Sequence, residues 1–150
     1  MDAEHPIVER ERLLADGIAV LDRLVAKLDA SAEHIALHTA GAEWTARDVF
    51  AHLARWHAHS LEEVMRLAVG DAAPAPLAGS EDEINARWLQ VDRVLTREQA
   101  RDWCIQSAAA LRRALLALSP EQWEAFGRSH AADVEGDHYR GHLGYLKPDS

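Results

Sequence analysis

The stretch that most constrains this fold is residues 44–59, WTARDVFAHLARWHAH. Thr45 is suited to cap a helix, since its hydroxyl can accept from an unpaired backbone N–H of the first turn, and Asp48 suits the positive helix end. After this cap, mainly apolar residues recur at steps of three and four, which is the spacing of one face of an α-helix. They are Val49, Leu53, Trp56, Ser60, Val64 and Leu67. We therefore predict an amphipathic helix over residues 45–70.

His52 lies at one edge of this stripe, together with Trp56 and His59. A histidine at the edge of a buried face is either packed and hydrogen-bonded in the core or placed to bind a metal ion. The helix alone does not distinguish these two interpretations, so the rest of the chain has to.

The composition excludes several classes of partner. The 150 residues carry a formal net charge of −9, and the pI is near 5.4. Phosphate binding requires concentrated positive charge, so we expect neither nucleic acid nor an anionic membrane as a partner. The N-terminus is charged, and no apolar run is long enough to span a bilayer. We expect one cytoplasmic domain over residues 1–150 that acts on a small molecule, and the single Cys104 fits a reducing compartment.

The residues before this stretch predict one long helix and a connector. Pro6 is tolerated in a first turn, and apolar residues then repeat with helical spacing to about Leu28. They are Ile7, Leu14, Ile18, Leu21, Val25 and Leu28. Residues 30–43 contain Gly41 and no such repeat, so we expect a connector with His34 and His38 as exposed loop residues.

Two successive capping boxes predict a break in the next helix. Ser80 with Glu83 starts a helix at Glu81, and Thr96 with Gln99 repeats the signature. The third helix is therefore broken near Leu95. Its first part carries Ile84, Trp88, Val91 and Leu95 on one face, and its second carries Cys104, Ala108, Leu111, Leu115 and Leu118. Ser119 caps a short extra helix near Pro120, which leaves Trp123 and Phe126 to close one end of the core.

The last segment, from about Ala131, contains three glycines that lower its helix propensity by roughly 1 kcal/mol each relative to alanine. Packing must therefore hold it helical. No stretch alternates with the period of two expected for strands, so the pattern predicts an all-α four-helix bundle.

The closing helix also carries a pair of candidate metal ligands. His138 and His142 are four residues apart, so both side chains point the same way from a helix. His52 is the best placed third ligand, which would complete an open three-histidine site for zinc, nickel or iron. The alternative is a buried polar cluster in which these imidazoles bond to one another or to water. The spacing alone leaves both open.

Other residues are candidates for supporting roles. His57 and His59 are candidate general acids or bases, although each also fits an ordinary core-edge or surface histidine. Asn85, Trp88 and Tyr139 are candidate substrate contacts. For Trp88 the alternative is core packing, and for Tyr139 it is plain solvent exposure.

These motifs resemble a known family. WTARDVFAHLARWH resembles the second-helix signature of the DinB-like superfamily, in which a tryptophan, a capping Ser or Thr and an HLA-x-W run accompany the first metal histidine. HYRGHLGYL resembles the closing HxxxH helix of that superfamily. EDEINARW and the same ending resemble the branch of colibactin self-resistance and DfsB-like proteins, and the N-terminal domain of mycothiol-dependent maleylpyruvate isomerase. The resemblance covers nearly the whole chain.

The resemblance implies a four-helix bundle with a divalent metal bound by His52, His138 and His142. It also implies a thiol transferase or hydrolase that uses a low-molecular-weight thiol such as mycothiol or bacillithiol on a small electrophile, and a homodimer. The sequence ends at Ser150 without the second domain of the isomerase, so we do not expect that specific reaction. The alternative is a non-catalytic binding or self-protection protein with a structural histidine cluster.

Overall fold

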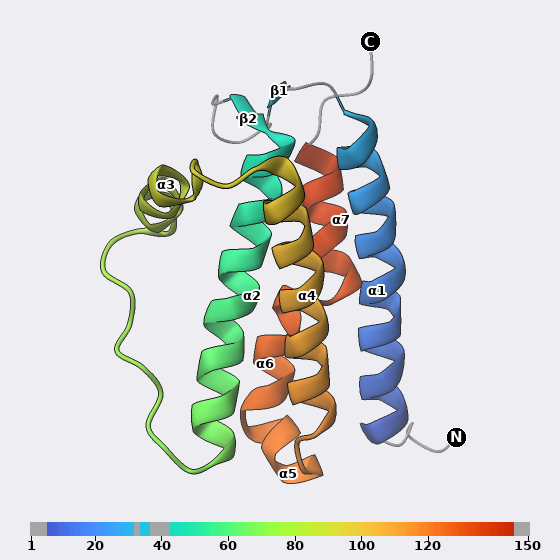
Figure 1. Cartoon of the computed structure of the whole chain (residues 1–150). Coiled ribbons are helices and arrows are strands. Elements are labelled where there is room, and N and C mark those ends of the chain that lie inside the picture. Colours follow the sequence, from blue (N-terminus) through green and yellow to red (C-terminus); the bar gives the residue numbers. More distant parts are fainter. Residues whose placement is uncertain (1–5, 32–33, 37–42, 146–150) are drawn as a thin grey trace.

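Four helices that run side by side form the body of the molecule (Figure 1). The computed structural model describes residues 6–31, 34–36 and 43–145. The bundle helices are α1 (Pro6–Ala30), α2 (Ala46–Ala68), α4 (Arg97–Leu116) and α7 (Gly136–Tyr145). In Figure 1, α1 and α7 run upward while α2 and α4 run downward, so α2 and α4 are parallel. The predicted all-α bundle is confirmed.

A chain of short helical turns joins α4 to α7. These turns are α5 (Pro120–Gln122), the π-helical turn η1 (Trp123–Gly127), α6 (Arg128–His130) and the 3-10 turn η2 (Ala131–Asp133). The short helix predicted near Pro120 is confirmed as α5, which Ser119 caps. The last α-helix, predicted from about Ala131, begins only at Gly136, because a 3-10 turn occupies the preceding residues.

Two short strands precede α2. They are β1 (His34–Ala36) and β2 (Glu43–Thr45), which pair antiparallel with His34 opposite Thr45. The prediction of His34 as a loop residue is therefore wrong, since it lies in β1, and His38 lies outside the described residues. Strands of three residues are too short to show alternation in a sequence, so the pattern could not indicate them.

Helix α2 lies against α4 and carries much of the core. The predicted cap is present, since the Thr45 hydroxyl accepts from the Asp48 N–H and the Asp48 carboxylate accepts from the Thr45 N–H. Its buried residues include Val49, Phe50, Leu53, Ala54, His57, Ser60 and Val64. Trp56, expected inside the stripe, is only partly buried, because the buried face is rotated toward His57.

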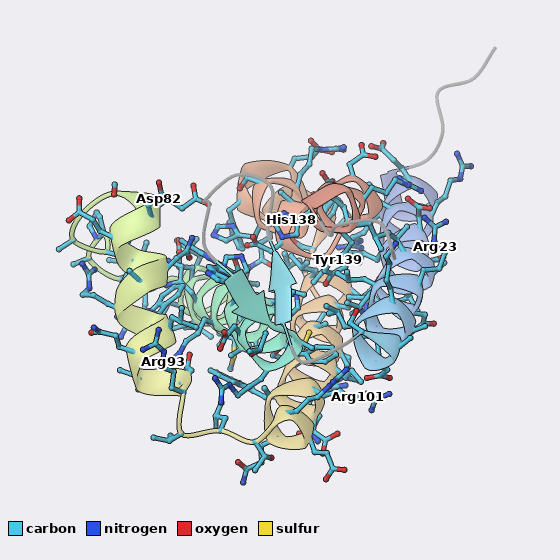
Figure 2. The ribbon with its side chains drawn as sticks, turned by 90° about the horizontal axis from the view of Figure 1, so that it is seen from above. Arg23, Asp82, Arg93, Arg101, His138 and Tyr139 are labelled. Carbon is cyan, nitrogen blue, oxygen red and sulfur yellow. The ribbon has the colours of Figure 1, made fainter. Side chains whose placement is uncertain are left out.

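The predicted break in the third helix is confirmed, and it is a complete separation. Ser80 caps α3 (Glu81–Asp92), and Thr96 caps α4, each with a full capping box. Figure 2, seen from above, shows α3 outside the bundle on the side of α2, with Asp82 and Arg93 marking its two ends. Val91, predicted to be buried, is 60% exposed, because α2 is the one described element against which α3 packs extensively.

Polar contacts attach α3 to α2. The Arg55 guanidinium donates to both carboxylate oxygens of Asp92, at 2.9 and 2.8 Å. From the next residue of α2, Trp56 Nε1 donates to Asn85 Oδ1 at 2.9 Å. The two parallel N–H···O bonds of the Arg55–Asp92 pair fix the orientation of the two side chains as well as their distance, since both bonds must align. The contacts of α3 with α2 thus hold it against the turns of α2 that carry His52 and Trp56.

Helix α1 approaches the end of η2 very closely. Gly17 is buried there, and a Cβ added to it would stand 1.8 Å from the carbonyl oxygen of Val134. Leu14, Leu21, Val25 and Leu28 are buried as predicted. Ile18 is 41% exposed, so its predicted place in the core is wrong. The close approach therefore depends on a glycine, and it sets the start of α7.

The lower end of the bundle is closed by Trp123 and Arg10. Trp123 is buried as predicted, and the Arg10 guanidinium lies 5.4 Å from the centre of its ring. Arg10 Nη1 donates to the carbonyl oxygens of Leu115 and Leu118, at 3.1 and 2.9 Å. Leu115 lies in the last turn of α4, and Leu118 follows the end of that helix. Backbone carbonyls at a helix end need donors from outside the helix. Arg10 therefore ties α1 to the end of α4.

Candidate functional site

His52 of α2 and His138 of α7 are distant in sequence, but each lies within range of the charge of the other. The His52 pKa is lowered to about 4, first by burial and then by the charge of a protonated His138. Burial also lowers the His138 pKa, against the opposing effect of the Asp133 and Glu81 carboxylates. Figure 2 shows His138 and Tyr139 on the side of α7 that faces the middle of the bundle. Both imidazoles are therefore neutral near pH 7, which is the form that binds metal ions.

For His142, the third candidate ligand, the structure describes the backbone and not the side chain. Helix α7 continues through residue 142, one turn beyond His138, but the His142 side chain is outside the described part of the chain. Within the part that is described, no three His, Cys, Asp or Glu side chains are grouped so as to hold a metal ion. The structure thus brings two candidate ligands together, and the complete triad stays a prediction.

Helix α3 places Asn85 and Trp88 beside His52. Asn85 hydrogen-bonds the His52 ring, which partly opposes the lowering of its pKa, and also accepts from Trp56 Nε1. The rings of Trp56 and Trp88 meet edge to face, with centroids 4.8 Å apart. A cavity of about 10 Å³, no larger than a water molecule, lies among these side chains. Its lining consists of Trp44, Asp48, Ala51, His52, Asn85, Trp88, Leu89 and Asp92.

His57 belongs to a buried hydrogen-bond chain deeper in the bundle. The Ser107 hydroxyl donates to the Cys104 carbonyl, so its oxygen accepts from His57 Nδ1 at 3.1 Å. His57 Nε2 is then left as an acceptor, and the Tyr139 hydroxyl donates to it at 2.8 Å. Burial is the main cause that lowers the His57 pKa to about 3 and raises the pKa of Tyr139. The chain fixes one tautomer of His57 and joins α2, α4 and α7.

Tyr139 is fully buried, so the solvent exposure expected as its default is wrong. The sequence could have indicated burial for His57, because it lies four residues after Leu53 and three before Ser60. Ser107 carried no comparable signal, since a small polar residue on an apolar stripe is common. The catalytic role of His57 and the substrate contact of Tyr139 stay predictions.

A second polar cluster lies further along α2. The two Glu63 carboxylate oxygens contact His59 Nε2 at 2.7 Å and His130 Nε2 at 3.2 Å. His130 Nδ1 is 2.9 Å from the Phe126 carbonyl oxygen, so both of its ring nitrogens face acceptors. Sequence reasoning missed Glu63 and His130, because their partnership joins residues far apart in the chain. The acid–base role predicted for His59 is untested, and its ring pairs with Glu63.

Asp133 connects this cluster to the candidate ligands. It accepts a short hydrogen bond from the Ser60 hydroxyl, and burial raises its pKa. A protonated His138 would lower that pKa, which places the carboxylate near the His138 ring. A cation held at the neutral imidazoles would thus have one carboxylate close by to balance its charge.

Comparison with known proteins identifies one family. A family model described as "Mycothiol maleylpyruvate isomerase N-terminal domain" matches residues 14–139, which is most of the chain. No curated protein and no solved structure shows a significant match. Among the described helices, none is long and apolar enough to cross a membrane.

Proposed function

The chain belongs to the family of mycothiol maleylpyruvate isomerase N-terminal domains, which are DinB-like helical domains, and we propose that it is a metal-dependent thiol transferase or hydrolase. Its substrate would be a small electrophilic molecule, and the thiol a low-molecular-weight one such as mycothiol or bacillithiol. The observation that carries the proposal is the meeting of His52 and His138, neutral and neighbouring, between α2 and α7. We further propose that the protein acts in the cytoplasm, where such thiols are kept reduced, and that it forms a homodimer.

The residues fit a divalent cation. His52 and His138 would hold the ion through ring nitrogens, and His142, one turn beyond His138, would supply the third ligand. Burial keeps the first two imidazoles unprotonated, so no proton has to leave before an ion binds. Zinc, nickel and iron all accept imidazole ligands. The nearby Asp133 carboxylate would offset part of the added positive charge.

When bound, the metal would lower the pKa of a thiol and so supply a thiolate at neutral pH. In a transfer reaction, the sulfur forms a bond to the electrophilic carbon while the leaving group departs with its bonding electron pair. Asn85 holds the His52 ring through a hydrogen bond, and the Trp44 ring packs against it edge on, with centroids 5.1 Å apart. These contacts orient the ligand.

The surroundings of His52 also limit which substrates can enter. The cavity beside it admits no more than a water molecule, and α3 forms its outer wall. An electrophile therefore reaches this side of His52 only if α3 shifts relative to α2. Trp56 and Trp88 would then offer an aromatic wall to the apolar part of the substrate. This arrangement favours small, flat electrophiles over bulky ones.

Metal content is the first test, measured by mass spectrometry on protein purified without a histidine tag. We expect close to one divalent ion per chain, and its loss in His138→Ala. His130→Ala is the matched control, because His130 lies in the second cluster with Glu63 and should leave the metal content unchanged. Metal far below one ion per chain in the unchanged protein, or full metal content in His138→Ala, would count against the proposed site.

The transferase reaction is tested next by incubating loaded protein with mycothiol or bacillithiol and 1-chloro-2,4-dinitrobenzene. We expect the thioether adduct to form faster than in the same mixture with His138→Ala. Metal binding without any adduct, for either thiol, would leave hydrolysis as the reaction to be tested.

A second function is favoured by the buried chain of Tyr139, His57 and Ser107. In that chain every ring nitrogen of His57 has a partner, so at least one histidine of this region serves the architecture. The corresponding proposal is a non-catalytic protein that binds or sequesters a small molecule. It predicts stoichiometric binding of an electrophile with no metal and no turnover.

A further inference from the structure

A groove between α1 and α4 is separate from the candidate metal site. Its volume is about 450 Å³, within the range of pockets that bind small molecules. It is lined by Glu11, Leu14, Ala15, Ile18, Ala109, Arg112, Arg113 and Leu116. The histidines of the candidate site are absent from this lining. The groove therefore needs an explanation of its own.

Two large apolar side chains are exposed in this groove. Ile18 of α1 is 41% exposed and Leu116 of α4 is 45% exposed, and both belong to the lining. The apolar repeat of α1 predicts Ile18 in the core, so its exposure departs from the pattern of its own helix. Leu14, at the same groove, is 2% exposed. The groove thus offers an apolar surface that water covers at a free-energy cost.

The groove also contains an arginine that forms no ion pair with the described residues, although the Asp22 carboxylate acts on it from a distance. Arg112 is half-buried, and its Nη1 is buried with no hydrogen-bond partner among the described residues. Burial lowers its pKa, which means that the charged form is poorly solvated. The neighbouring Tyr139 and Cys104 stay neutral near pH 7, since burial raises the pKa of both, that of Cys104 to about 12. Neither group therefore supplies a negative charge, and the Asp22 carboxylate, which does carry one, forms no ion pair with Arg112.

Other partly buried arginines of this chain have acceptors. Arg10 donates to two carbonyl oxygens at the end of α4, and Arg55 forms the two-pronged pair with Asp92. Arg97 donates to the carbonyl oxygens of Leu28 and Ser31. Arg10 Nε is also buried without a partner, but the same guanidinium has two acceptors at Nη1, whereas Arg112 has no acceptor among the described residues. Leaving a buried charged donor unpaired is costly, so Arg112 differs from these three.

We propose that the α1–α4 groove binds an amphipathic monocarboxylate, whose carboxylate pairs with Arg112 and whose apolar body lies along Ile18 and Leu116. A carboxylate suits the planar guanidinium, and a turn of the Arg112 side chain toward the groove would give its buried Nη1 the acceptor that it lacks. Arg113 adds a second positive charge to the lining. Glu11 lies in the same lining and repels further negative charge, so a single carboxylate is favoured over two.

The test is calorimetric titration of the full chain with sodium decanoate below its micelle concentration. Decanamide is the matched probe, because it keeps the apolar chain and loses the charge. We expect decanoate to bind with one site per chain and decanamide to bind at least about tenfold more weakly, since charge-assisted hydrogen bonds are the stronger ones. Equal binding of the two probes would overturn the pairing with Arg112, and no binding of decanoate would overturn the site.

Variants then locate the binding. Arg112→Met should weaken decanoate binding by about tenfold or more, because it removes the half-buried charge. Arg113→Met, in the same groove, should change it by only about twofold, because this arginine is exposed. Ala15→Phe fills the groove from an exposed position and should abolish binding without loss of folding, as checked by thermal unfolding. Unchanged binding in Arg112→Met or Ala15→Phe would place decanoate elsewhere.

Sedimentation distinguishes the remaining occupant, a second copy of this chain. If the protein is a dimer that Arg112→Met or Ala15→Phe dissociates, the groove is a subunit interface and the carboxylate proposal fails. None of these measurements uses metal or thiol, so their outcome is independent of the proposed transferase activity.

Discussion

Replacing Gly17 by alanine should destabilise the fold, although alanine is the better helix former. The added Cβ would stand 1.8 Å from the Val134 carbonyl oxygen and 3.0 Å from the Val134 carbonyl carbon. Carbon and oxygen atoms normally approach to about 3.3 Å, so the two segments must separate by roughly 1.5 Å. Both contacts are backbone atoms, which cannot turn aside as a side chain does.

The magnitude follows from two opposing effects. Helix propensity favours alanine over glycine by about 1 kcal/mol. Overpacking costs about 1–3 kcal/mol, and a backbone clash belongs at the upper end of that range. We therefore expect the free energy of unfolding to fall by about 2 kcal/mol, which lowers Tm by roughly 4–8 °C for a chain of this size. Because Val134 leads into α7, the same change should displace His138 from His52 and weaken metal binding.

Urea denaturation followed by circular dichroism measures the effect. Ala19→Gly is the control, since Ala19 is exposed on the same helix and its replacement should cost only the propensity difference of about 1 kcal/mol. If Gly17→Ala is as stable as the unchanged protein, or more stable, then α1 and Val134 do not approach as closely as described and the reasoning is refuted.

Two further predictions concern pH and the attachment of α3. His52 and His57 have folded-state pKa values of about 4 and about 3, well below the unfolded value near 6.5. The unfolded chain therefore binds these protons first, and stability of the metal-free protein should fall as pH drops from about 6.5 to about 4, by up to about 1.4 kcal/mol per pH unit for each histidine. Urea midpoints in EDTA check this, and a flat profile over that range would contradict the burial of both rings. Asp92→Asn should weaken the Arg55 pair and speed hydrogen exchange in α3, with Glu98→Gln as the control. Global stability should fall by only about 1 kcal/mol, since Arg55 is partly exposed.

The starts of the helices could be predicted because their signals are local. The capping boxes at Thr45, Ser80, Thr96 and Ser119 each join residues three apart, and all four are present. The break between α3 and α4 followed from two of them. A cap depends on neighbouring residues only, so tertiary packing has little opportunity to override it.

The departures all depend on what lies opposite a residue. Ile18 and Val91 fit an apolar repeat, yet no element covers them fully, because α4 leaves a groove beside α1 and α3 lies outside the bundle. The backbone between the 3-10 turn and Gly136 likewise lies against Gly17 of α1, a contact that no local pattern indicates. The apolar repeat indicates which face of a helix is suited to burial. Which element covers that face depends on contacts between segments that are distant in the sequence.

The candidate site also contains some features that the sequence could predict and others that it could not. Helical spacing made His52 the best placed partner of His138, and the family's resemblance favoured metal binding over a polar cluster. In the structure the two rings lie within range of each other's charge. The partners of His57 and His59 could not be foreseen, since Tyr139 and Ser107, and Glu63 with His130, meet only when α2 packs against the other helices. Long-range polar contacts leave no periodic trace.

The parallel arrangement of α2 and α4 has a consequence for chain length. Because α2 ends at the bottom of the bundle and α4 begins at the top, residues 69–80 must return along most of α2 before α3 begins (Figure 1). Helix α2 has 23 residues and is about 34 Å long, while the 12 residues between Ala68 and Glu81 reach at most about 40 Å when fully extended. The connection therefore has almost no slack. Removing even two or three residues would draw α3 down α2 by about a helical turn and bring different side chains opposite His52.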